Sequence, residues 1–228
     1  MLFFSRTTTE GMVMGRRLRY WGVAVGGALL LAGCVGGLQI YPTVQQRSIT
    51  LKAGDLEAHG IGFLTPSAAT GQEEEKQAIA LVFAEVMQQK RPAIRVVPLA
   101  ETLGVVNKNG LADAYIRMYN DYRESGLLRH EILQQVGKAT GVRYMAQIKV
   151  QGFGQSAKER FGMLGFRIVE TKTAGVRLFF QIWDSRDGTV AWEATQELHY
   201  SYDTTSERQL TLPQVVGRAA EDLVSKLP

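Results

Sequence analysis

The sequence predicts a single α/β domain, a sandwich in which helices cover a mixed, mostly antiparallel sheet, behind an N-terminal secretory signal. Three observations predict this fold class. Apolar residues recur at helical spacing in several segments before residue 141, and short apolar runs lie between the first of these segments. From Arg143 onward a period of two prevails, as in antiparallel strands. The resulting order of strand, helix, strand, helix pair, antiparallel strands and final helix is that of an α/β sandwich.

The N-terminal residues have the parts of a secretory signal. Behind a cluster of three arginines lies an apolar run over 20–32, which is too short to span a membrane because a spanning helix needs about 20 apolar residues. Leu31, Ala32 and Gly33 lead into Cys34, the only cysteine of the chain. This stretch resembles a bacterial lipobox. The resemblance implies cleavage before Cys34, diacylglycerol on its sulfur and acylation, such as by palmitate, of the new amino terminus.

The lipobox resemblance sets the expected location and organisation. Two or more acyl chains hold a protein stably at a membrane, and Val35 after the cysteine implies, by the sorting rule of lipoproteins, the periplasmic face of the outer membrane. We expect a signal peptide over 1–33, with Met14 as an alternative start, a lipidated tether over 34–46 and the α/β domain over 47–228. An ordinary membrane anchor with a buried free cysteine is the alternative.

Charge and cysteine content exclude two classes of protein. The net charge of +4 falls to +1 for residues 34–228, because the signal segment holds four arginines and one glutamate. A balanced chain has no basic footprint for nucleic acid, so no nucleic-acid partner is expected. A single cysteine excludes an intrachain disulfide framework.

Helices are predicted where an apolar stripe recurs and turn signals end it. The clearest helix has three glutamates in its first turn and Lys90 at its end, charges that complement the helix dipole. Tyr115, Tyr119 and Tyr122 are interpreted as a packing stripe rather than as an aromatic ligand platform. The predicted helices are 72–90, 111–125, 128–140 and 213–227.

Strands are predicted from alternation or from short apolar runs. The strand that starts at Arg143 is expected to be half-buried, and the segment 175–184, apolar on both faces, is expected to be central. Trp192 alternates in phase with Val190 and Ala194, which predicts a core residue. The predicted strands are 47–56, 59–64, 94–98, 143–151, 166–173, 175–184 and 189–200.

Residues 152–165 are predicted to form a mobile, exposed loop that contacts a partner. Four glycines in this stretch give the backbone unusual freedom, and its apolar residues follow no regular period. The segment matches the dinucleotide pattern G-x-G-x-x-A, but a phosphate site also needs a helix to begin there, and a strand follows instead. A spacer and a membrane-inserting hairpin over 153–173 are the alternatives. The candidate partner-binding residues are Phe153, Lys158, Arg160, Phe161, Met163 and Leu164.

No catalytic or metal-binding motif is present in the sequence. G-x-S-x-G, H-x-x-x-H and C-x-x-C are all absent, and His59, His130 and His199 are the only histidines. Each is interpreted as a surface or half-buried side chain. We therefore expect a protein that is not an enzyme and that holds no cofactor and no metal.

Two segments resemble a family of periplasmic lipoproteins. One part of the pattern is carried by Ser125–Leu128, Ile132-Leu133 and Thr140–Tyr144. The other is carried by Phe180–Glu193, which has the form strand, D-x-x-x-G turn and strand. The family includes CsgG, LpoB and the amino-terminal domain of TolB. The resemblance implies a small α/β domain of the anticodon-binding-like type, which works by binding other proteins or by assembling into rings.

Two functions follow from this resemblance. The first is a non-catalytic protein-interaction or assembly module of the cell envelope, which binds an envelope protein or itself. The alternative is a CsgG-like oligomeric outer-membrane secretion channel subunit, which would need paired amphipathic strands of about ten residues. The charged run Lys158–Arg160 in the only candidate segment disfavours the alternative. A hydrolase ranks third.

Overall fold

A mixed sheet of seven strands organises the part of the domain that the structure describes. The computed structural model describes residues 39–68, 73–163, 166–204 and 211–228. The strand order is β1-β7-β6-β5-β2-β4, and β3 also pairs with β5. The strands are β1 (Gln39–Ser48), β2 (Ile61–Phe63), β3 (Ser67–Ala68), β4 (Val96–Val97), β5 (Tyr144–Met163), β6 (Phe166–Asp184) and β7 (Thr189–Thr204).

The long strands are antiparallel and the short ones are parallel. β1, β7, β6 and β5 are antiparallel neighbours, whereas β2 runs parallel to both β4 and β5, and β3 runs parallel to β5. β6 lies between β5 and β7, which confirms the prediction of a central strand over 175–184. The predicted mixed, mostly antiparallel sheet is also confirmed.

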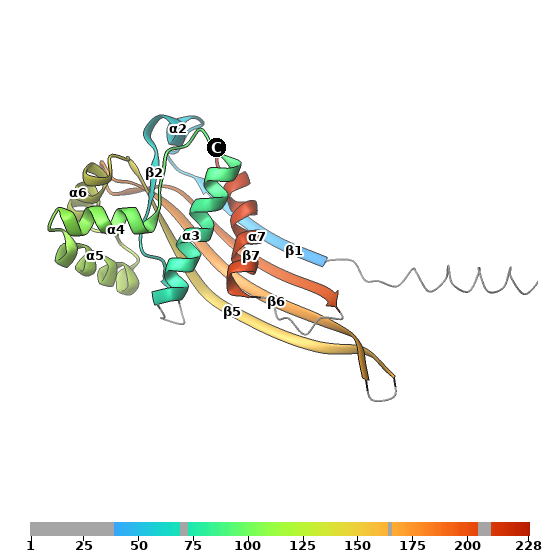
Figure 1. The fold of residues 1–228 in the computed structure, drawn as a ribbon. Coiled ribbons are helices and arrows are strands. Elements are labelled where there is room, and N and C mark those ends of the chain that lie inside the picture. The colour runs from blue at the N-terminus through green and yellow to red at the C-terminus, as the bar shows by residue number, and fades with distance from the viewer. Residues whose placement is uncertain (1–38, 69–72, 164–165, 205–210) are drawn as a thin grey trace, which may run out of the picture. The chain divides into compact units, whose positions relative to one another are not determined.

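Helices pack against both faces of the sheet, and α4, α5 and α6 cover only the end of their face where β5 begins (Figure 1). One hydrophobic cluster unites α3 and α7 with one face of the sheet. A second cluster unites α4, α5 and α6 with the other face, near the starts of β5 and β7. The helices are α2 (Asp55–His59), α3 (Glu73–Lys90), α4 (Leu99–Lys108), α5 (Ala112–Ser125), α6 (His130–Thr140) and α7 (Leu212–Ser225).

The predicted helices are present and end where the sequence indicates. α5 and α6 each stop at a glycine in the left-handed region, Gly126 with φ 76° and Gly141 with φ 69°. α7 has a proline in its first turn, and the Gln214 side chain accepts a hydrogen bond from the N–H of Thr211 at 2.9 Å. The apolar stripe of α7 is buried, as its spacing predicts.

The first half of β5 is buried on both faces, so the prediction of a half-buried strand is wrong. Tyr144 and Ile148 face α3 and α7, and both are at most 1 % exposed. Met145 on the opposite face is 0 % exposed, because the second helical cluster packs over it. The polar side chain of Gln147 had indicated that this face is exposed to solvent. It is also buried, and its Nε2 donates to the carbonyl oxygen of Thr65 at 3.1 Å.

β1 replaces most of the predicted tether. Residues 39–46 were predicted to be tether, but they belong to β1, which pairs with β7 from Gln39 opposite Ser201 to Ser48 opposite Trp192. The predicted edge strand 47–56 accordingly begins earlier and ends at Ser48. β1 is polar because it is an edge strand with little apolar surface to bury. Its partner, β7, is distant in sequence, so no local pattern indicates the pairing.

Two further differences concern one helix and one strand. α4 was not predicted, although Leu99, Thr102 and Val106 on its inner face are buried. The predicted separate strands 166–173 and 175–184 form one continuous strand, β6. The remaining short strands, β2 and β4, lie within the apolar runs that predict them.

Trp192 lies in the main core, as its alternation predicts. It is 1 % exposed, and its ring meets Phe180 edge-on with the centroids 5.6 Å apart. Phe180 in turn contacts Phe83 of α3 at 5.2 Å. This aromatic chain joins β7, β6 and α3 across the interface between sheet and helix.

Candidate functional site

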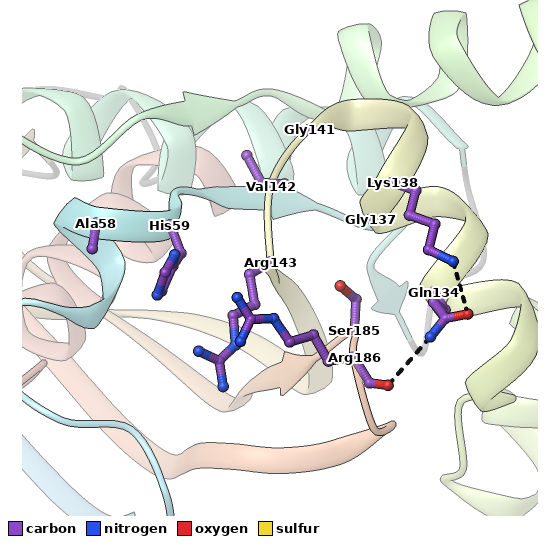
Figure 2. A pocket seen from close by; sticks show the side chains of 10 residues that line it. All are labelled: Ala58, His59, Gln134, Gly137, Lys138, Gly141, Val142, Arg143, Ser185 and Arg186. Atoms are coloured by element: carbon purple, nitrogen blue, oxygen red, sulfur yellow. Dashed lines mark hydrogen bonds between the residues drawn. The ribbon is translucent and has the colours of Figure 1, made fainter.

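A cleft of about 420 Å³ lies at the end of the sheet where β5 begins and β6 ends. Its walls come from α2, the C-terminal half of α6, the residues that lead into β5, and the turn between β6 and β7 (Figure 2). No described lining residue is acidic, whereas four are basic: His59, Lys138, Arg143 and Arg186. Ala58, Gln134, Gly137, Gly141, Val142 and Ser185 complete the lining.

Arg143 is held in the cleft by a carboxylate behind it. It stands beside Asp184 because its neighbour Tyr144 is the register partner of that residue. Its Nε and Nη2 atoms donate to Asp184 Oδ2 at 2.9 and 2.5 Å, and its guanidinium lies 5.1 Å from the centroid of the Tyr144 ring. The hydrogen bond to Asp184 raises the pKa of Arg143 above its usual value, so the guanidinium stays charged.

The turn after β6 is fastened to α6. Asp184 Oδ1 accepts the N–H of Arg186 at 3.0 Å, and the carbonyl oxygen of Arg186 lies 2.8 Å from His130 Nε2 and 3.4 Å from Gln134 Nε2. Gly188 has φ 72°, and a Cβ there would lie 2.8 Å from that of His130. The backbone of Arg186 is therefore fixed, and Figure 2 shows its side chain extending toward the guanidinium of Arg143.

The floor of the cleft depends on a close approach between α6 and the same turn. A Cβ at Gly137 would lie 2.3 Å from Ser185 Oγ, so this position of α6 accepts only glycine without a shift. Ser185 is 5 % exposed. In the described part of the chain no hydrogen bond joins it to His59.

The end of α6 contributes carbonyl groups close to the cleft. Arg95 donates to the carbonyl oxygens of Thr140 at 3.2 Å and Gly141 at 3.1 Å, which offsets the negative end of the helix dipole. On the exposed side of α6, Lys138 Nζ donates to Gln134 Oε1 at 3.2 Å. The described residues hold no group of three or more His, Cys, Asp or Glu side chains that could bind a metal ion.

Two further hollows differ in character. One of about 320 Å³ between α3 and α4 is mostly apolar and includes Leu81, which is 54 % exposed. The other, of about 290 Å³, lies on the uncovered polar face of the sheet, where Arg177 and Glu197 form an ion pair.

The predicted loop over 152–165 is wrong for the described residues. Residues 152–163 continue β5 and pair with β6 out to Met163 opposite Phe166. Beyond Glu170, which lies opposite Thr204 of β7, β6 pairs only with β5 within the described chain. Pairing between strands overrides the local preference of the glycines for a loop.

The candidate partner-binding residues therefore lie on a β-hairpin. Phe153 is partly buried against the main core rather than exposed. Lys158, Arg160, Phe161 and Met163 lie within β5, and Leu164 falls outside the described residues. Their role in binding stays a prediction.

The predicted anchor also lies outside the described residues. This holds for Cys34 and for Leu31, Ala32 and Gly33 before it. Among the helices that the structure describes, none has the length and apolar character needed to cross a bilayer.

Sequence reasoning missed the basic cleft. It identified the turn over 184–188 and the end of a helix at Gly141, but it did not predict that these two features lie beside one another in the fold. The available signal was that Arg143 and Asp184 open and close two neighbouring antiparallel strands, which places them side by side. The positions of Lys138 and His59 depend on how α6 and α2 pack, which no local pattern reveals.

No protein-family model and no curated protein matches this sequence. Several solved structures resemble the fold at a distance, among them the following three. A PelC dodecamer from Paraburkholderia phytofirmans has a TM-score of 0.41 and 14 % identity over 82 % of this chain and 95 % of that one. Lipoprotein GNA1162 from Neisseria meningitidis has a TM-score of 0.41 and 14 % identity over 74 % of this chain and 96 % of that one. A PDZ domain protein from Parabacteroides distasonis has a TM-score of 0.33 and 9 % identity over 90 % of this chain and 40 % of that one. Likenesses this distant carry no functional argument.

Proposed function

We propose that this chain is a lipid-anchored lipoprotein of the cell envelope that acts as a non-catalytic protein-interaction or assembly module. The anchor rests on the lipobox resemblance of residues 31–34 behind a secretory signal. The observation that carries the interaction role is the β5–β6 hairpin, which continues beyond the parallel strands and beyond β7.

The hairpin presents free strand edges. On its outer side β5 pairs with β2 and β3 only as far as Val150 opposite Ala68, so within the described chain residues 152–163 have no neighbour there. Unpaired N–H and C=O groups along such an edge are a template for a strand of another chain. A long free edge in a folded domain is an aggregation hazard unless a partner covers it, which supports a binding role.

The hairpin can be shortened without disturbing the rest of the sheet. Glu159 and Glu170 are register partners, and Glu170 is also the last residue of β6 that pairs with β7. Replacing residues 160–169 by Asn-Gly, which favours a two-residue hairpin turn, removes only the β5–β6 pairs beyond Glu159 and Glu170 and should preserve the rest of the sheet. We expect the shortened protein to keep its melting temperature and to lose its partner, because the deletion removes the outer part of the free edge, 160–163, with the candidate contacts Arg160, Phe161 and Met163.

The test is photo-crosslinking in intact cells, followed by purification and mass spectrometry. A photoreactive residue at Gly154, exposed on the hairpin, is compared with one at Glu85, exposed on α3. Crosslinks to another envelope protein from Gly154 alone, lost on shortening, support the proposal. A ladder of self-crosslinks would favour the alternative of an oligomeric channel subunit. Full pathway activity of the shortened protein would make the hairpin a spacer.

The anchor has a separate test. Cys34→Ser removes the acylated sulfur and should release the protein from the membrane fraction, as measured by fractionation and immunoblotting. Unchanged membrane association of this variant would refute the lipid anchor and leave the hairpin result unaffected.

A further inference from the structure

We propose that the basic cleft binds the phosphate group of a small phosphate ester, with Arg186, Lys138 and the free edge of Arg143 as its ligands. This site lies outside the proposed interaction role, because the anchor and the hairpin contribute nothing to it. Three segments supply the three cations: the turn after β6, helix α6 and the start of β5.

Two guanidinium groups line the cleft together although like charges repel, and the ammonium of Lys138 stands beside Gln134 on the α6 wall. Arg143 and Arg186 line the same cleft, and Figure 2 shows both side chains directed into its centre, with His59 on one wall and Lys138 on the other. Asp184 neutralises Arg143 in part, but no described acidic side chain forms an ion pair with Arg186 or Lys138. A bound anion would relieve this repulsion.

The carboxylates near the cleft are already engaged. Asp184 accepts hydrogen bonds from Arg143 and from the N–H of Arg186. Asp55 accepts the N–H of Lys52 at 2.9 Å, and Asp187 accepts the N–H of Thr189 at 2.9 Å. These groups hold the backbone around the cleft, and none of them is among its lining residues.

The remaining obstacle to an anion is the C-terminal end of α6, whose carbonyl oxygens carry partial negative charge. Arg95 occupies two of them, those of Thr140 and Gly141. Ser185 Oγ has no hydrogen-bond partner among the described residues and faces the cleft in Figure 2, where it can donate to an oxyanion. The surroundings therefore favour an acceptor-only ligand.

Charge selects phosphate over carboxylate. Two cations, Arg186 and Lys138, have no carboxylate partner in the described chain, and a phosphate ester carries between one and two negative charges at neutral pH. A ligand with a single carboxylate would neutralise only one of these two cations. The planar fork of an arginine also suits two phosphate oxygens. The volume of about 420 Å³ leaves room for a small organic group beside the phosphate.

The position of the cleft favours a soluble ester over a lipid headgroup. The cleft lies at the end of β7 that begins with Thr189, because Thr189 pairs with Asp184 beside the cleft. The first residue of β1, Gln39, pairs with Ser201 near the other end of β7. Twelve residues of strand separate these two pairs, about 40 Å. The cleft thus lies at the end of the sheet remote from Gln39, the described residue nearest the proposed anchor.

The test is calorimetric titration of the full lipidated chain in a non-ionic detergent. Inorganic phosphate and glycerol phosphate are the probes, and acetate is the comparator. We expect saturable binding of both phosphates, with acetate weaker. Each of Arg186→Ala and Lys138→Ala should weaken phosphate binding about 10-fold or more, since a charge-assisted hydrogen bond is lost.

Arg218→Ala is the matched control, because it removes the same charge from an exposed site on α7, where Arg218 pairs only with Glu221 in the described chain. It should bind phosphate as the unmodified chain does. Arg186→Gln and Lys138→Gln repeat the test if an alanine variant melts early. The titration is repeated with micelles that contain phosphatidylglycerol. If these micelles compete with free phosphate, the site is supported and its ligand is a lipid headgroup.

Three results would overturn the proposal. These are no saturable heat with either phosphate, equal affinity for acetate and phosphate, and equal weakening by Arg218→Ala. The outcome is separable from the proposed function, because Cys34→Ser and the shortened hairpin should both retain phosphate binding.

Discussion

Replacing Trp192 by alanine is expected to destabilise the domain strongly. The side chain is 1 % exposed, and it lies between β7 and the helices α3 and α7 in the main core. Truncating a buried tryptophan typically costs about 3–5 kcal/mol of unfolding free energy. The edge-on contact with Phe180, at 5.6 Å between centroids, is part of that loss.

The loss translates into a measurable change of melting temperature. In a domain of this size each kcal/mol lowers the melting temperature by about 2–4 °C, so the expected decrease is about 6–20 °C. Trp192→Phe should decrease it less, because a ring still reaches Phe180. Leu81→Ala, at a side chain 54 % exposed, is the surface control and should change it little.

The assay is thermal unfolding by circular dichroism, combined with the in-cell crosslinking assay. A variant Trp192→Ala that melts as the unmodified chain does but loses its partner would refute the core assignment. Trp192 would then belong to an interface. Early melting with partner binding retained at low temperature is the expected result.

Two further predictions concern polar groups that the fold buries. Asp184→Asn removes the charged partner of Arg143 and should lower the unfolding free energy in urea by about 1.5–3 kcal/mol; an unchanged midpoint would show that the ion pair contributes nothing. Burial raises the pKa of Tyr122 from its ordinary 10.0 to about 12. Its contribution to stability is therefore complete below about pH 10 and is lost as the pH rises toward 12. Tyr122→Phe should lose less stability across that interval, and equal losses in the two proteins would contradict the assignment.

Local sequence patterns were sufficient for the helices with clear caps and stripes. In α3 the buried positions Ile79 and Phe83 recur at helical spacing, and Pro92 follows its end. α4 escaped prediction because its buried face includes Thr102 and its centre holds Gly104, which blur the apolar stripe. Propensity is a weak guide where a short helix is held by tertiary packing.

The strands show where local reasoning fails. β1 is polar throughout most of its length, and what makes it a strand is the ladder with β7, more than 140 residues later in the chain. The glycines at 152 and 154 predicted a loop, yet both lie in the ladder with β6. The cleft could not be predicted from the sequence for the same reason, because its walls meet only in the folded chain. These walls are α2, α6, the start of β5 and the β6–β7 turn.

One irregularity in β5 connects the core to the hairpin. Val150 pairs with Leu178 and Gly152 pairs with Arg177, so Gln151 is an extra residue, a β-bulge. If Gln151 were paired and the alternation unbroken, Phe153 would lie three residues after Val150 and point to the opposite face, because successive residues of a strand alternate. The extra residue instead returns Phe153 to the face of Val176, where it packs against the core. The bulge therefore extends the hydrophobic core onto the base of the hairpin, and this attachment lets a glycine-rich segment stand as an ordered strand pair.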